Sequence, residues 1–198
     1  MVDGVMQKEL PVRKKIRLEG YDYSSNGAYF ITICSKNQQN IFTLCRGDPC
    51  GRPCSHNQNG FELNELGEIC KNIIYEIEKK YNITIQKYII MPNHIHMIIL
   101  ISPDTSRASP DTSRASPDTS RATARVAPTI GRIIGGYKSI ISNAWLKKCK
   151  ENNVYMGQIW QSRFYDRIIR NETEYKHIWR YIEENPEKWE EVYNEQYK

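Results

Sequence analysis

The sequence predicts one α+β domain, in which a few strands combine with amphipathic helices. Segments rich in β-branched and aromatic residues alternate along the chain with segments whose apolar residues recur every three or four positions. Two of the strand-type segments are neighbours joined by a turn signal, which is typical of paired strands. The chain has 198 residues, enough for one domain with a real core but few for two.

Composition narrows the classes of function. The net charge of +5 and the pI of about 8.8 favour a polyanionic partner. No stretch approaches the roughly 18 consecutive apolar residues of a membrane span, and the polar N-terminus lacks the apolar core of a secretory signal. We therefore expect a cytoplasmic protein without a membrane partner. Its cysteines are then expected to be reduced thiols, at positions Cys34, Cys45, Cys50, Cys54, Cys70 and Cys149.

The first element in chain order is a basic arm, followed by a strand. The arm contains Arg13, Lys14, Lys15 and Arg17, which could lie along phosphates or simply be solvated. Residues 28–35, AYFITICS, have the aromatic and β-branched content of a strand.

Residues 45–59 are rich in Gly, Pro, Cys and Asn without periodicity, which predicts a surface loop. Cys45, Cys50, Cys54 and His56 offer four zinc ligands there, although their spacing differs from that of paired C-x2-C knuckles. A structural zinc site in this loop stays open as an alternative.

A helix is predicted from an N-cap at Asn64 to the neighbourhood of Tyr81. Its apolar positions recur at three- and four-residue intervals, as expected of a stripe that faces a core: Leu66, Ile69, Cys70, Ile73, Ile74 and Ile77.

The most informative stretch is residues 83–102, ITIQKYIIMPNHIHMIILIS, where Met91-Pro92-Asn93 separates two strand-like runs. His94 and His96 are two residues apart in the second run, so a strand turns both imidazoles to one face. Paired imidazoles among apolar residues suggest a divalent metal site. The alternative is that both histidines face solvent on a half-exposed strand.

A tandem heptad follows, reading PDTSRAS, PDTSRAS and PDTSRAT over residues 103–123. Because its largest apolar residue is Ala, it cannot bury enough surface to offset the entropy of ordering, and we expect a disordered insertion over residues 103–127. The absence of a hydrophobic seam excludes a coiled coil.

Helical spacing returns at Thr129 and continues to Lys150. Gly135 and Gly136 weaken the middle of this helix by about 1 kcal/mol each relative to Ala, which suggests close packing or a bend. Lys138 follows directly and is a candidate for contact with DNA.

Residues 158–170, QIWQSRFYDRIIR, predict the last strand with its approach. Arg163, Arg167 and Arg170 are interleaved with aromatic residues, which suits single-stranded nucleic acid because guanidinium groups bind phosphates and rings stack on bases. Core aromatics with solvated arginines are the alternative.

A final helix is predicted over residues 172–184, with Tyr175, Ile178, Trp179 and Ile182 as its buried stripe. Tyr181 and Asn185 fall one turn apart on the flank of that stripe, and His177 precedes Tyr181 by one turn. Because Pro186 cannot continue the hydrogen-bond ladder, the helix should end at Asn185 or restart as a short helix over residues 186–193 that is capped by Asn185.

Three segments together resemble the REP-associated tyrosine transposases of the HUH superfamily of single-strand DNA nucleases, where HUH denotes His, a hydrophobic residue and His. The segments are RLEGYDYSSNGAYFITICS, MPNHIHMIIL and IWQSRFYDRIIRNETEYKHIWRYIEENPEKW, in this order. The resemblance covers nearly the whole chain except residues 45–59 and the heptad tract, which look like insertions. It implies a ferredoxin-like antiparallel sheet backed by helices.

The resemblance also implies roles for individual residues. His94 and His96 match the two ligands of a catalytic Mg²⁺ or Mn²⁺, and Tyr181 matches the nucleophile. Asn185 matches a position that supplies a further ligand, and His177 is placed to assist the tyrosine.

The implied activity is metal-dependent cleavage and rejoining of single-stranded DNA at hairpin-bearing, REP-like repeats through a 5′-phosphotyrosine, by a monomer or homodimer acting in the cytoplasm at the nucleoid. The lack of a G-x4-G-K-[ST] phosphate loop agrees with strand transfer that needs no ATP. A non-catalytic nucleic-acid-binding module, such as a decayed transposase, is the main alternative.

Overall fold

The computed structural model describes residues 25–44, 56–57, 60–102 and 129–196. The basic arm at positions 13–17, the three cysteines at 45, 50 and 54, and the heptad tract lie outside these ranges, so the predictions made for them stay untested. Within the predicted loop 45–59, the backbone of His56–Asn57 forms a short strand, β2, which pairs with β3 (Gly60–Phe61). Cys34, Cys70 and Cys149 are free thiols.

One four-stranded antiparallel sheet organises the domain, in the order β4-β5-β1-β6. Along the chain its elements are β1 (Gly27–Cys34), α1 (Glu65–Tyr81), β4 (Thr84–Ile90), β5 (His94–Ile101), α2 (Ile130–Glu151) and β6 (Tyr165–Ile169), followed by α3 (Glu172–Gln196); a 3-10 turn (Lys36–Gln38) follows β1. This βαββαβ order with these neighbours is the ferredoxin-like arrangement. The predicted α+β class is therefore confirmed, and only the strand within residues 158–170 is shorter than expected.

Local side-chain chemistry sets the predicted helix starts. The Asn64 side chain accepts a hydrogen bond from the Gly67 amide at 3.0 Å, and Thr129 accepts one from the Arg132 amide at 3.3 Å. These bonds satisfy amides that have no partner within the first turn of a helix.

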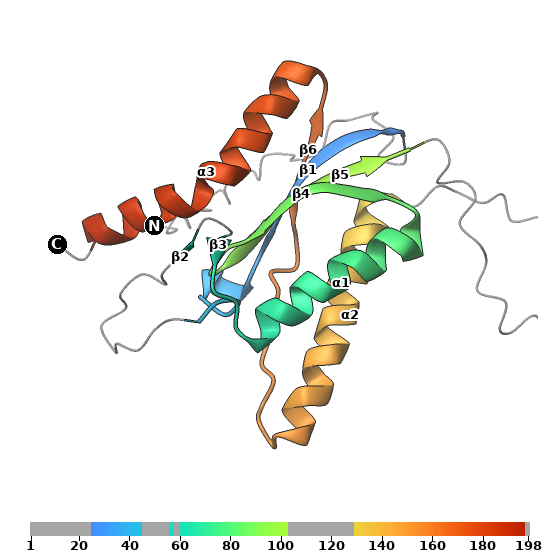
Figure 1. Ribbon diagram of the computed structural model, residues 1–198. Helices are drawn as coiled ribbons and strands as arrows, with labels where there is room; N and C mark the ends of the chain where they lie inside the picture. Colours follow the sequence, from blue (N-terminus) through green and yellow to red (C-terminus); the bar gives the residue numbers. More distant parts are fainter. Residues whose placement is uncertain (1–24, 45–55, 58–59, 103–128, 197–198) are drawn as a thin grey trace, which may run out of the picture.

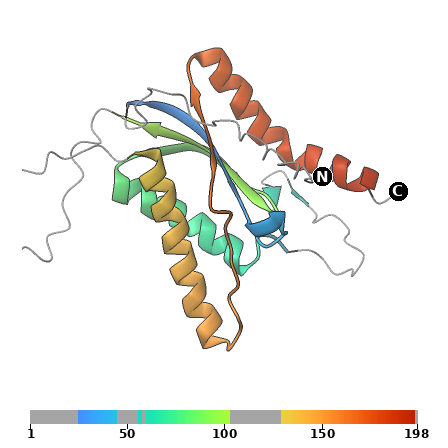
Figure 2. The same ribbon diagram turned by 180° about the vertical axis from the view of Figure 1, so that it is seen from behind.

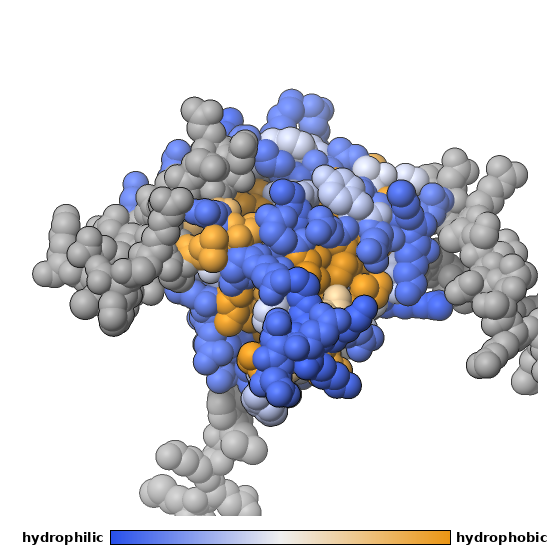
Figure 3. Space-filling model, turned by 60° about the horizontal axis from the view of Figure 1, so that its bottom comes forward, coloured by the Kyte–Doolittle hydropathy of each residue, from blue (hydrophilic) through white to orange (hydrophobic). Residues whose placement is uncertain are grey.

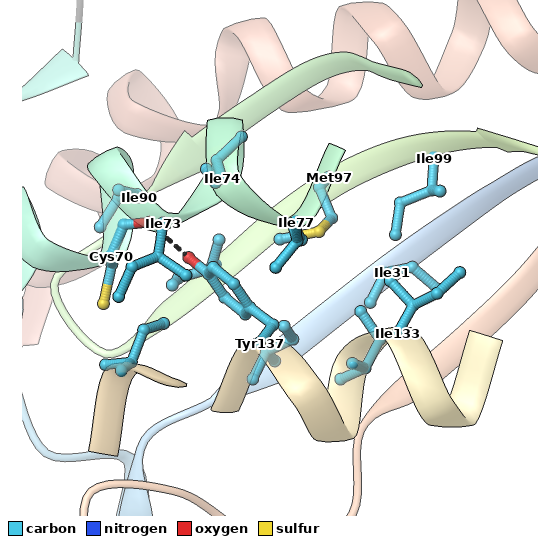
Figure 4. Close-up of a cluster of buried hydrophobic side chains, with 14 of the residues drawn as sticks. Ile31, Cys70, Ile73, Ile74, Ile77, Ile90, Met97, Ile99, Ile133 and Tyr137 are labelled. Atoms are coloured by element: carbon cyan, nitrogen blue, oxygen red, sulfur yellow. Dashed lines mark hydrogen bonds between the residues drawn. The ribbon is translucent and has the colours of Figure 1, made fainter. Parts of the chain in front are cut away.

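The larger core lies between one face of the sheet and the helices α1 and α2 (Figures 1 and 2). Alternate residues of β1 and β5 point into it, as the period of a strand requires. Tyr137 crosses this core, and its hydroxyl donates to the backbone carbonyl of Cys70 at 2.9 Å (Figure 4). Gly136 lies against the Tyr81 side chain, so the predicted close packing at the glycine pair is confirmed at its second position.

The opposite face of the sheet carries α3 over a smaller core (Figures 1 and 2). Its buried members come from four elements: Phe30, Ile98, Ile169, Ile178 and Ile182. On the outside, the surface visible in Figure 3 is mostly hydrophilic, with hydrophobic areas between the polar side chains.

A bulge in β4 determines which side chains meet α3. Ile85 pairs with Ile99, whereas Lys87 pairs with Ile98, so the register shifts at Gln86. Without this extra residue Lys87 would point into the larger core. Instead its ammonium group bonds to Glu183 of α3 at 3.0 Å and lies over the Trp179 ring at 4.8 Å.

The prediction that the last helix ends or restarts at Asn185 is wrong. Helix α3 passes through Pro186 to Gln196, so Asn185 lies inside the helix and is not a cap. Proline removes one backbone donor, but the turns after it are held by packing of Trp189 against β5, with its ring centroid 5.7 Å from that of His94. Tertiary packing therefore overrides the local cost of proline, and the helix bends along its length (Figure 2).

Candidate functional site

The two histidines of β5 lie side by side under α3. Their Nε2 atoms are 3.0 Å apart and their ring centroids 4.5 Å apart. His96 is only 4% exposed and His94 is half-buried. The alternative of two solvent-facing histidines is therefore wrong, since His96 is buried and His94 is half-buried beside it.

Each ring is held at its other nitrogen. His94 Nδ1 is 2.6 Å from Asn93 Oδ1, and His96 Nδ1 is 2.9 Å from Thr32 Oγ1. Burial lowers the pKa of His94 to about 4 and that of His96 to about 3, with repulsion from His94 adding to the second shift. Both imidazoles are neutral at pH 7, as metal ligands must be.

Helix α3 places an aromatic residue over each histidine. The Tyr181 ring is 5.4 Å from the His96 ring, edge to face, and 6.0 Å from the Phe30 ring. Trp189, two turns later, lies over His94. Tyr181 is 39% exposed, so solvent reaches a side chain whose ring contacts the buried pair.

Asn185 lies between Tyr181 and Trp189 along α3, one turn from each. Asn185 is 9% exposed, and its Nδ2 donates to the Tyr181 carbonyl at 3.3 Å. The amide oxygen is the atom that could bind a cation, and this hydrogen bond leaves it available. His177 is exposed one turn before Tyr181, and no hydrogen bond joins these two described residues.

The spacing of the two histidines fits a cation. Two ligands at neighbouring corners of an octahedron, each about 2.1 Å from the ion, are about 3.0 Å apart, as the two Nε2 atoms are. Within the described ranges, no cluster of three or more His, Cys, Asp or Glu side chains could hold a metal. Among the described residues, Asn185 on the facing helix offers an amide oxygen, and its role as a third ligand stays a prediction.

Comparison with known proteins places this geometry in a family. Residues 54–109, which include His94 and His96, match the family described as "Transposase IS200 like". An uncharacterised protein of Haemophilus influenzae is 34% identical over 182 residues, which cover 90% of this chain and 91% of that protein. The chain belongs to the IS200-like transposase family.

Two solved structures are distantly similar. One is a REP-associated tyrosine transposase bound to a REP hairpin, with 18% identity and a TM-score of 0.47 over 87% of this chain and 74% of that one. The other is a proposed transposase from Deinococcus radiodurans, with 12% identity and a TM-score of 0.45 over 84% of this chain and 95% of that one.

In this member of the IS200-like transposase family, the ammonium group of Lys138, a candidate for contact with DNA, is bonded within the protein. Its ammonium group donates to the carbonyls of Gln161 at 2.8 Å and Arg163 at 3.1 Å. Burial lowers the pKa of Lys138, although nearby Cys34 acts in the opposite direction. These bonds join α2 to the segment before β6, and contact of Lys138 with DNA stays a prediction.

The three arginines predicted to contact DNA are all exposed. Arg167 lies on the sheet face that carries α3 and bonds to Glu174 at 2.7 Å. Arg163 precedes β6 and Arg170 follows it. All three lie in or next to the edge strand β6, and contact of any of them with DNA stays a prediction.

Sequence reasoning missed four residues of the site: Thr32, Asn93, Phe30 and Trp189. Thr32 pairs with His96 across the β1–β5 ladder, a register that strand periodicity alone cannot supply. Trp189 was overlooked because Pro186 suggested that the helix had ended. Its spacing of eight residues from Tyr181 was the available signal.

No helix within the described ranges combines the length and apolar character needed to cross a bilayer.

Proposed function

We propose that this protein cleaves and rejoins single-stranded DNA with Tyr181 as the nucleophile. The observation that carries the proposal is the position of Tyr181, whose half-exposed ring packs against His96 from a different element of the fold. A tyrosine next to two neutral, converging imidazoles combines a nucleophile with the ligands of a cation.

In this reaction the Tyr181 hydroxyl attacks a DNA phosphorus atom. The bond from phosphorus to the tyrosine oxygen forms, the bond to the 3′-oxygen breaks, and the hydroxyl proton is released to solvent while the 3′-oxygen takes one up. A 5′-phosphotyrosine and a free 3′-hydroxyl result. Attack by a 3′-hydroxyl reverses these steps and joins DNA without ATP.

His94 and His96 would hold a Mg²⁺ or Mn²⁺ ion through their Nε2 atoms, with Asn185 as a further ligand from the facing helix. Such a cation polarises the phosphate and stabilises the charge that develops on the leaving oxygen. The protein's own contribution is placement. The core beneath α3 holds the Tyr181 ring against His96, and Phe30 packs against both rings.

The proposed substrate is single-stranded DNA that carries a hairpin. The net charge of +5 supports a polyanionic partner, and the exposed residues Arg163, Arg167 and Arg170 lie in or next to the edge strand β6. A REP hairpin is the DNA bound in the distantly similar structure of a REP-associated transposase. We propose a hairpin of this kind as the first substrate to examine.

Covalent-adduct formation tests the proposal directly. Purified protein is incubated with hairpin-bearing oligonucleotides and Mg²⁺ or Mn²⁺, and adducts are resolved on a denaturing gel. Tyr181→Phe should abolish the adduct and retain DNA binding. Tyr165→Phe is the matched control, because Tyr165 is also exposed, at 44%, on the same face of the sheet.

An undiminished adduct in Tyr181→Phe would overturn the assignment of the nucleophile. If the wild-type protein binds the oligonucleotides but forms no adduct with any of them, the non-catalytic binding module is the better description. Loss of the adduct in His94→Ala and in His96→Ala, with DNA binding retained, would support the cation site.

A further inference from the structure

The side chain of Asn93 has only one orientation that satisfies both of its neighbours. Asn93 Nδ2 is 3.1 Å from the Gln38 backbone carbonyl, and Oδ1 is 2.6 Å from His94 Nδ1. A carbonyl only accepts hydrogen bonds, so the amide nitrogen must face Gln38 and the amide oxygen must face His94. His94 Nδ1 therefore carries a proton, and a neutral His94 presents a lone pair at Nε2.

This lone pair determines the state of the second ring in the metal-free protein. His94 Nε2 and His96 Nε2 are 3.0 Å apart, which is hydrogen-bonding distance. Since His94 Nε2 can only accept, His96 Nε2 must carry the proton that the bond requires. A neutral His96 then has a bare Nδ1, which accepts a hydrogen bond from the Thr32 hydroxyl at 2.9 Å.

A cation bound by both Nε2 atoms requires the opposite tautomer of His96. The proton must leave Nε2 and one must be taken up at Nδ1 by exchange with water, so the net charge of the ring is unchanged. His96 Nδ1 then donates, and its partner must accept. A hydroxyl can do both, whereas the Asn93 amide oxygen can only accept.

We propose that Asn93 locks His94 in the tautomer that binds a cation, and that Thr32 lets His96 change tautomer when the cation arrives. Thr32 and Asn93 are thus positioning residues with different roles. The proposal rests on the cation site of the proposed function. Its first half, however, concerns the metal-free protein and can be tested without any cation.

Nitrogen-15 NMR of histidine rings reads the tautomers directly. In protein held in chelator, long-range proton–nitrogen correlations should show His94 protonated at Nδ1 and His96 protonated at Nε2. Saturation with Mg²⁺, which is diamagnetic, should move the His96 proton to Nδ1 and leave the His94 tautomer unchanged. The opposite tautomer at His94 in chelator would overturn the role of Asn93.

The remaining outcomes separate this proposal from the proposed function. If Mg²⁺ perturbs both Nε2 atoms but His96 was already protonated at Nδ1 in chelator, the switch at Thr32 is refuted while the cation site stands. If neither Mg²⁺ nor Mn²⁺ affects either ring, the cation site itself fails, and the switch fails with it. The tautomer of His94 in chelator still decides the role of Asn93.

Paired variants test the contribution of each side chain. Thr32→Val keeps the shape but removes the hydroxyl, and should weaken Mn²⁺ binding, measured by calorimetry, by about 10- to 100-fold. Thr32→Ser retains the hydroxyl and should bind close to the wild-type level. Asn93→Ala should yield a mixture of His94 tautomers in chelator. Equal Mn²⁺ affinity for Thr32→Val and Thr32→Ser would contradict the assigned role of the hydroxyl.

Discussion

The adjacent glycines of α2 allow the contact between Gly136 and Tyr81 to be measured, with Gly135 as the control. An added Cβ at Gly136 would overlap the Tyr81 hydroxyl and approach Tyr81 Cζ to 3.0 Å, whereas a Cβ at Gly135 would meet nothing within 4 Å. Both positions lie in the same helix, so Gly→Ala produces the same gain in helix propensity at each, about 1 kcal/mol.

The two variants should therefore differ in their free energy of unfolding, with Gly135→Ala the more stable. Gly135→Ala should raise the free energy of unfolding by about 1 kcal/mol. Gly136→Ala gains the same propensity but overpacks the core at a cost of about 1–3 kcal/mol, so its net effect should range from about neutral to about 2 kcal/mol destabilising. The difference between the free energies of unfolding of the two variants gives the steric cost of the contact with Tyr81.

Urea unfolding followed by circular dichroism measures both free energies, provided that the slope with denaturant is unchanged. Adding Tyr81→Phe to Gly136→Ala removes the hydroxyl that overlaps and should recover part of the loss, and the double-mutant cycle gives the coupling. The recovery should be incomplete because Cζ remains close. If Gly136→Ala proves as stable as Gly135→Ala, the Tyr81 side chain moves aside without cost, and the predicted steric penalty is refuted.

Three further predictions concern α3 and the histidines. Ile182→Ala should lower the free energy of unfolding by about 2–5 kcal/mol and speed hydrogen exchange mainly in α3, because Ile182 is fully buried in the smaller core. In the control Ile134→Ala, which alters a residue fully buried in the larger core, exchange should become faster throughout the domain. The same exchange pattern in both variants would contradict separate cores. Lys87→Met should modestly lower the adduct yield and the protection of α3 from hydrogen exchange, since it removes the bond to Glu183 at 3.0 Å. An exposed pair of this type is worth roughly 0.2–1 kcal/mol. Unchanged protection from exchange would show that the bond does not hold α3. Mn²⁺ should raise the melting temperature of the wild-type protein and not of His96→Ala, because a ligand stabilises only the state that binds it; equal shifts in differential scanning fluorimetry would place the ion elsewhere.

Much of the fold follows from local patterns in the sequence. The N-cap residue Asn64 and the three-to-four periodicity of the apolar positions predict α1 and α2, because both signals depend on contacts within a few turns. The period of a strand likewise predicts that His94 and His96 share a face. The spacing of Tyr181 and Asn185 predicts one flank of a helix.

The tertiary structure decided which surfaces meet. Only the docking of α3 on the histidine face of the sheet brings Tyr181 against His96 and Trp189 against His94. Such contacts join residues far apart in the sequence, so no local period contains them.

Long-range packing also changed what strand alternation and the helix-breaking tendency of proline predict, and it set the strand register. A bulge at Gln86 turns Lys87 from the core to α3, and α3 continues through Pro186. The β1–β5 register sets Thr32 beside His96. Local sequence patterns thus predict most of the elements and the chemical groups of the site, whereas strand register and helix docking, which depend on the whole chain, set their arrangement.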